Sequence, residues 1–132
     1  MTSSVTYIGD LRTEATIYTF RCEKIITDAP VDNEGKGAAF SPTDLAATSL
    51  ATCMLTIMGI AARNRDIDMK GTMANVTKSM AADHRRISEI QINITFPEHL
   101  SAKERTILKR SAAHCPVGNR LSADLIEAVN FS

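Results

Sequence analysis

The sequence predicts an α+β fold, in which antiparallel strands accompany one very apolar helix. Apolar and polar residues alternate near residues 5–17 and 87–96, which is typical of strands with one buried face. The segment from Leu45 to Ala62 has no charged residue, and a helix start precedes it. A second capping sequence begins a shorter helix near residue 101. The expected order is therefore strands, helix, strand pair, helix and strand.

The first 37 residues predict two strands and a loop. Residues 5–17 alternate as a strand does, with a bend or bulge at Gly9 and Asp10. Residues 20–27 are apolar enough for a second strand, a hairpin partner of the first. Residues 28–37 are dense in Pro, Gly, Asp and Asn, which indicates a loop.

The central helix has a clear beginning. Ser41 is a helix cap, Pro42 suits the first helical position, and the carboxylate of Asp44 faces unpaired backbone N–H groups. We expect this helix to end at about Arg63 and Asn64.

The remainder predicts a strand at 69–81, a turn at 83–86 and a strand at 87–96, the last two strands forming an antiparallel hairpin. Ser101 and Glu104 form a capping box for the second helix. Its solvent-facing side consists of Lys103, Arg105, Lys109 and Arg110, and a final strand covers 125–131.

Composition limits the class of protein. A chain of 132 residues makes a single domain, 1–132, and 44% hydrophobic content with zero net charge excludes a disordered chain. A pI near 6.8 argues against nucleic acid as a partner. Three cysteines are too few for a disulfide scaffold, and no signal peptide is visible, so we expect a cytoplasmic protein.

The uncharged segment reaches the lower length limit of a membrane span. Polar and small residues interrupt it, namely Thr48, Ser49, Thr52, Thr56 and Gly59. We therefore expect a helix buried by its own protein and no membrane partner.

Cys53 lies within this helix, where a cysteine is either a small packing residue or a reactive thiol. The field of the helix N-terminus fades beyond the first turn. A reactive Cys53 therefore needs a cation from elsewhere, and Arg12 and Arg21 on the predicted N-terminal strands are the candidates.

Cys115 has a different setting, because Pro116 must end or kink the helix there. A zinc site from Cys22, Cys53, His114 and Cys115 is conceivable, although structural zinc sites usually show closely spaced ligand pairs. The plain reading of Cys22 is a packing residue of a strand.

Two segments resemble the cysteine motifs of the OsmC/Ohr family. Residues 41–53, SPTDLAATSLATC, are similar to its central-helix motif, and Cys115-Pro116-Val117 to its second cysteine motif. The segments 9–12 and 27–37 also look like OsmC-type proteins. The resemblance covers nearly the whole chain.

The resemblance implies an intertwined homodimer, with antiparallel sheets wrapped around central apolar helices. It also implies thiol-dependent reduction of organic hydroperoxides in oxidative-stress defence. Cys53 would be the peroxidatic thiolate, Cys115 the resolving thiol, and Arg12 the arginine that stabilises the thiolate, with Arg21 as a substitute.

One position departs from the family pattern. Its well-known members have a glutamate directly after the helix-opening proline, where it orients that arginine. Here Thr43 follows the proline and the carboxylate comes at Asp44, which turns about 100° further around the helix. Asp44 is thus either an orienter of Arg12 or only a helix cap, and efficient turnover is in question.

The implied reaction needs no bound cofactor or metal. Cys53 would become a sulfenic acid and then a disulfide with Cys115, and an external dithiol, such as a lipoyl group by family analogy, would reduce that disulfide. The alternative reading is a non-catalytic binding protein for a small apolar ligand.

Overall fold

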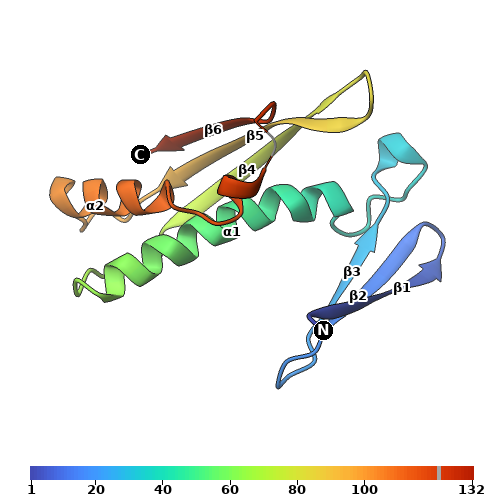
Figure 1. Cartoon of the computed structure of the whole chain (residues 1–132), viewed down its shortest axis with the longest axis horizontal. Helices are drawn as coiled ribbons and strands as arrows, with labels where there is room; N and C mark the ends of the chain where they lie inside the picture. Colours follow the sequence, from blue (N-terminus) through green and yellow to red (C-terminus); the bar gives the residue numbers. More distant parts are fainter. Residues whose placement is uncertain (122) are drawn as a thin grey trace. The chain divides into compact units, whose positions relative to one another are not determined.

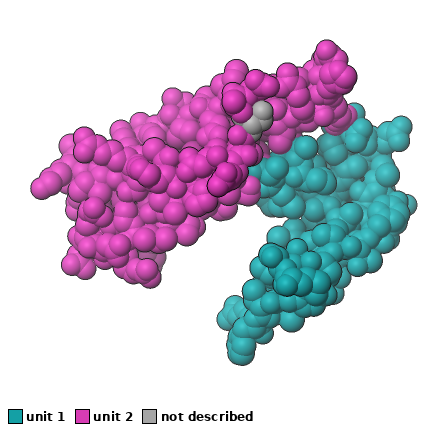
Figure 2. All heavy atoms as spheres, viewed as in Figure 1, with its two compact units in different colours: residues 1–46 teal, residues 47–132 magenta. Residues whose placement is uncertain are grey.

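The computed structural model describes residues 1–121 and 123–132 and confirms the α+β class. The chain forms two compact units, residues 1–46 and residues 47–132, which are coloured separately in Figure 2. The first unit contains three strands, and the second contains the remaining strands and the two α-helices of Figure 1, of which the first begins at the end of unit one.

The first unit is a three-stranded antiparallel sheet in the order β1-β2-β3. Its strands are β1 (Ser3–Gly9), β2 (Arg12–Ile17) and β3 (Lys24–Asp28). β1 and β2 form a hairpin whose two turn residues, Asp10 and Leu11, have positive φ values of 53° and 59°. Such a pair makes a turn whose twist matches the flanking strands. The bend predicted near Gly9 is therefore a tight turn between two strands.

The segment between β2 and β3 differs from the sequence prediction. The second strand was expected at 20–27, but it begins only at Lys24. Residues 18–23 form a turn, in which Cys22 is exposed and has a φ of 47°. The prediction of Cys22 as a strand packing residue is thus wrong, and Arg21 also lies in this turn and not on a strand.

The α1 helix (Pro42–Arg63) begins and ends as predicted. The backbone N–H of Asp44 donates to Ser41 Oγ at 3.1 Å, and the backbone N–H of Ser41 donates to Asp44 Oδ2 at 2.9 Å. This reciprocal pair satisfies backbone groups that the first helical turn leaves open. It explains why the helix starts at the proline.

The second unit contains the sheet β4 (Met73–Ala81), β5 (Arg86–Thr95) and β6 (Ile126–Phe131), with β5 in the centre. β4 and β5 form the predicted antiparallel hairpin. β6 runs parallel to β5, contrary to the expectation of antiparallel strands alone. The α2 helix (Ala102–Ala112) lies between β5 and β6 in the sequence and returns the chain to the start of β5, as a crossover connection between parallel strands must.

Both helices lie against the same face of this sheet (Figure 1). The residues at the contact between the helices and the sheet are fully buried: Leu50 and Met58 from α1, Leu108 from α2, and Ile90, Ile92 and Ile94 from β5. The alternation predicted for β5 therefore gives this unit its core. Arg105 departs from the predicted wet side of α2, because its guanidinium donates to the carbonyls of Leu100 and Pro97.

The α1 helix is long and apolar enough to cross a membrane by length and composition, with a mean hydropathy of 1.8. One third of that stretch is buried within the protein, and its buried residues belong to the core of the second unit. A core helix passes the same test of length and hydropathy.

Candidate functional site

Cys53 lies in the middle of α1, on the edge of the core. Its neighbours Ala51 and Met54 are buried, whereas Cys53 itself is half-buried and packs against the core cluster. The side chain therefore stands between the apolar interior of the second unit and its surface. Its backbone is held by a helix of 22 residues.

Cys115 lies in the turn that follows α2. The backbone N–H of Cys115 donates to the carbonyl of Ala112 at 3.2 Å, and that of Asn119 donates to the Cys115 carbonyl at 3.1 Å. Pro116 stands between these two turns, and its ring prevents the helix from continuing. Cys115 is 2% exposed, so this turn places its cysteine in the interior.

The structure brings the two cysteines together. The thiol of Cys115 is hydrogen-bonded to Cys53, and its sulfur also lies 3.9 Å from the carbonyl oxygen of Leu50 on the preceding turn of α1. Burial raises the pKa of the Cys115 thiol, and the hydrogen bond to Cys53 raises this pKa further. The backbone N–H groups of Gly118 and Val117 act against this shift, because they stabilise the thiolate.

A carboxylate lies close to the same turn. A β-carbon placed on Gly118 would lie 3.1 Å from Glu127 Oε2 and 3.4 Å from Leu50 Cδ1. Glu127 is exposed as a residue, and partial burial of its carboxyl group raises its pKa. The absence of a side chain at Gly118 therefore lets β6 and α1 approach the turn that holds Cys115.

Arg12 and Asp28 face one another in the first unit. Arg12 begins β2 and pairs directly with Asp28 at the end of β3, so their side chains lie on one face of the sheet. Asp28 is 1% exposed, and its Oδ1 and the Nε of Arg12 are buried polar atoms without a hydrogen-bond partner among the described residues. Buried polar atoms rarely lack a hydrogen-bond partner, so we treat Arg12 and Asp28 as a candidate site.

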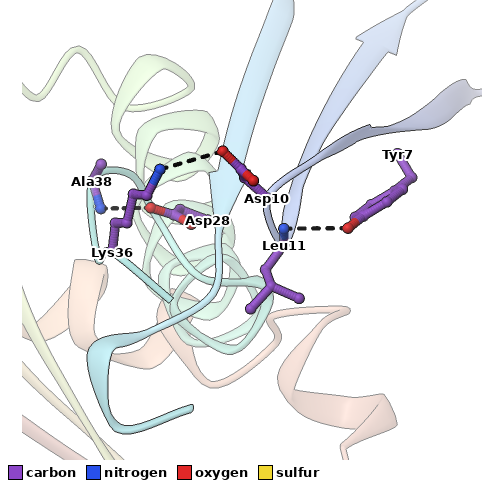
Figure 3. Close-up of polar contacts among 6 residues, drawn as sticks. All are labelled: Tyr7, Asp10, Leu11, Asp28, Lys36 and Ala38. Atoms are coloured by element: carbon purple, nitrogen blue, oxygen red, sulfur yellow. Dashed lines mark hydrogen bonds and ion pairs between the residues drawn. The ribbon is translucent and has the colours of Figure 1, made fainter. Parts of the chain in front are cut away.

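Asp28 also holds the loop that follows it, as Figure 3 shows. Its Oδ2 accepts a hydrogen bond from the backbone N–H of Ala38 at 2.9 Å. Lys36 forms an ion pair at 3.3 Å with Asp10, which lies in the β1–β2 turn beside Arg12. A side chain at Gly35 would collide with the Ala29 carbonyl, so the loop requires glycine there.

Sequence reasoning missed Asp28 because it placed this residue in a loop beyond the strand. The signal available was a carboxylate directly after three apolar or β-branched residues, Ile25, Ile26 and Thr27. Asp44, which the sequence proposed as an orienter of Arg12, uses its Oδ2 to cap α1. Its action on Arg12 stays a prediction.

The predicted residues fall into both units. Arg12, Arg21 and Asp44 belong to the first unit, whereas the contacting pair Cys53 and Cys115 belongs to the second. The described residues contain no group of three or more His, Cys, Asp or Glu side chains that could hold a metal ion.

The family model described as OsmC-like protein matches residues 35–127, which include both cysteines of the contacting pair. The chain belongs to the OsmC-like protein family. This confirms the resemblance that the two cysteine motifs indicated.

Solved structures agree with this membership. A protein of Psychrobacter arcticus 273-4, described as an osmotic stress induced and detoxification response protein, is 55% identical with a TM-score of 0.94 and covers 100% of this chain and 96% of its own. The OsmC-like protein of Mycoplasma pneumoniae is 20% identical, with a TM-score of 0.79 over 98% and 94% of the two chains. The comparison with curated proteins gives no match.

Other solved OsmC-like folds are more distant in sequence. A Legionella pneumophila protein, described as an organic hydroperoxide resistance protein OsmC, is 15% identical with a TM-score of 0.71 and covers 100% of this chain and 97% of its own. At this identity the likeness shows the fold alone.

Proposed function

We propose that this OsmC-like protein is a thiol-dependent peroxidase that reduces organic hydroperoxides to alcohols. The observation that carries the proposal is the contact between Cys53 on α1 and the buried Cys115 beyond α2. A pair of thiols in contact can form a disulfide by condensation after one of them is oxidised. OsmC-like folds described as organic hydroperoxide resistance proteins support the substrate class.

The difference in burial between the two cysteines supports their proposed roles. Cys53 is half-buried and reachable, so its thiolate attacks the distal peroxide oxygen, the O–O bond breaks, and an alcohol leaves after protonation. Cys53 is then a sulfenic acid. The sulfur of Cys115 attacks the Cys53 sulfur, a disulfide forms, and the hydroxyl leaves as water. Together, these reaction steps consume one hydroperoxide and oxidise two thiols.

Arg12 is the proposed cation for the Cys53 thiolate, and Asp28 the carboxylate that orients it. The support is within the first unit: Asp28 is buried directly opposite Arg12, and each has a buried polar atom without a partner. A guanidinium held by one carboxylate keeps further N–H groups for an anion. Asp44 remains an alternative orienter, although one of its oxygens caps the helix.

A homodimer is part of the proposal, because the first unit has no buried apolar side chain among its described residues. Its sheet instead exposes large apolar side chains, including Val5, Tyr7, Ile17 and Ile25. An exposed apolar surface of this kind marks an interface. A second copy of the chain is the occupant that the family resemblance implies.

We propose an external dithiol, such as a lipoyl group, as the reductant, and no bound cofactor. The cysteines that exchange would be Cys53 and Cys115. The proposed compartment is the reducing cytoplasm, in which such a disulfide is transient.

Titration of thiols tests the function. A protein with the exposed Cys22 replaced by serine has two thiols per chain, and both should be lost on addition of stoichiometric cumene hydroperoxide. Dithiol should restore both. The matched control, Cys53→Ser in the same background, should lose none. A protein that keeps both thiols but retains a fatty acid would instead be a non-catalytic binding protein.

A further inference from the structure

The two sulfurs of the contacting pair differ in their access to solvent. Cys115 is 2% exposed and belongs to the hydrophobic core of the second unit. Cys53 is half-buried and lies at the edge of that core. A thiol reduces a disulfide by approaching one of its sulfurs, so the approach path decides which sulfur is attacked.

Backbone N–H groups near the sulfur of Cys115 can stabilise a negative charge on it. The backbone N–H groups of Val117 and Gly118 interact with the sulfur of Cys115. The hydrogen bond from the Asn119 N–H to the Cys115 carbonyl, 3.1 Å long, closes the turn in which these groups lie. Because the N–H groups belong to the backbone of a closed turn, they are in place before charge develops.

We propose that the reducing dithiol attacks the sulfur of Cys53, and that Cys115 leaves as a thiolate received by the N–H groups of Val117 and Gly118. This inference rests on the proposed Cys53–Cys115 disulfide. The attacking thiolate forms a bond to Cys53 Sγ, the bond between the two cysteines breaks, and its electron pair goes to Cys115 Sγ. That sulfur then takes a proton from solvent.

The second thiol of the reductant completes the exchange. It attacks the sulfur of the reductant that is bound to Cys53, the mixed disulfide breaks, and Cys53 is released as a thiolate. The dithiol is oxidised to a disulfide, and the protein regains two electrons and both thiols. The reductant therefore never forms a bond to the sulfur of Cys115.

Two properties of Cys115 act in opposite directions. Burial raises the pKa of its thiol, which makes it a slower leaving group, and the two backbone N–H groups lower that pKa. Access decides between the two directions of attack, because Cys115 is 2% exposed and Cys53 is only half-buried.

The first test maps the mixed disulfide. In a Cys22→Ser background, the pair is oxidised with diamide, treated briefly with the monothiol 2-mercaptoethanol, quenched in acid and alkylated. Peptide mass spectrometry then shows which cysteine carries the mixed disulfide with 2-mercaptoethanol. We expect this mixed disulfide on Cys53 in about tenfold excess or more over Cys115. Equal labelling, or an excess on Cys115, would overturn the inference.

The second test measures each sulfur alone, with the disulfide reagent DTNB. In the same background, Cys115→Ala leaves Cys53, which should react in the folded protein. Cys53→Ala leaves Cys115, which should react only after unfolding in guanidinium. Comparable rates in the folded variants would contradict the inference.

Neither test depends on peroxide. A chain that fails to reduce cumene hydroperoxide but still gives the expected labelling would lose the proposed function and keep the direction of attack. A chain that diamide cannot oxidise to the Cys53–Cys115 disulfide would overturn the inference itself.

Discussion

The buried thiol of Cys115 donates a hydrogen bond to Cys53, and this contact joins the turn after α2 to the middle of α1. Because burial and this hydrogen bond raise the pKa of Cys115, its thiol keeps its proton at neutral pH. Cys115 is thus a donor in the resting protein and not an attacking group. In the proposed mechanism it reacts only after the Cys53 sulfur has been oxidised and is electrophilic.

Removal of the resolving thiol should therefore expose Cys53 to further oxidation. In Cys115→Ala, the sulfenic acid of Cys53 has no partner, so excess peroxide should convert it to the sulfinic acid. Mass spectrometry should show a gain of two oxygen atoms, whereas the parent protein forms a disulfide. Cys22→Ala should behave as the parent. A variant that stays unmodified in excess peroxide would show that Cys53 is not the peroxidatic thiol.

Arg12→Ala should slow the reduction of cumene hydroperoxide by about a hundredfold, which corresponds to roughly 2.7 kcal/mol of lost transition-state stabilisation. The physical reason is the loss of the cation that we propose for the Cys53 thiolate. Stopped-flow measurement of thiol oxidation gives this rate. Arg21→Ala is the matched control, because Arg21 lies in an exposed turn, and its rate should be unchanged. If Arg21→Ala lowered the rate of thiol oxidation and Arg12→Ala did not, Arg21 would be the cation in place of Arg12.

Substitutions can distinguish whether Asp28 or Asp44 orients Arg12. Asp28→Asn removes the charge opposite Arg12, and we expect the same rate to fall about tenfold. Asp44→Asn disturbs the cap of α1, so it should lower the melting temperature and leave the rate near that of the parent. Circular dichroism and stopped-flow rates distinguish these effects. The reverse pattern would restore Asp44 to the role.

Local chemistry made much of the fold predictable. Pro42 after a capping serine, the alternation along β5, and the capping box of α2 each depend on residues close in sequence, and each was confirmed. The direction of β6 was not predictable from its own residues. It follows from the path of the crossover through α2, which is a property of the whole unit.

The candidate site was also predictable only in part from the sequence. The cysteine motifs were visible in the sequence, but the contact between Cys53 and Cys115 depends on how α1 and α2 pack. Asp28 was missed because its importance comes from burial and from the strand register opposite Arg12. Neither burial nor register appears in a single segment of sequence.

Glu127 should lower the stability of the folded protein at neutral pH. Burial raises its pKa above the ordinary 4.5, so the folded state favours the protonated form and stability falls as pH rises through that pKa. Glu127→Gln should therefore melt at a higher temperature than the parent at pH 7, and the difference should shrink below pH 4.5. Glu104→Gln is the control of opposite sign, because hydrogen bonds to Ser101 lower the pKa of Glu104. Thermal melts at both pH values measure each difference, and a Glu127→Gln protein that melts lower at pH 7 would contradict the prediction.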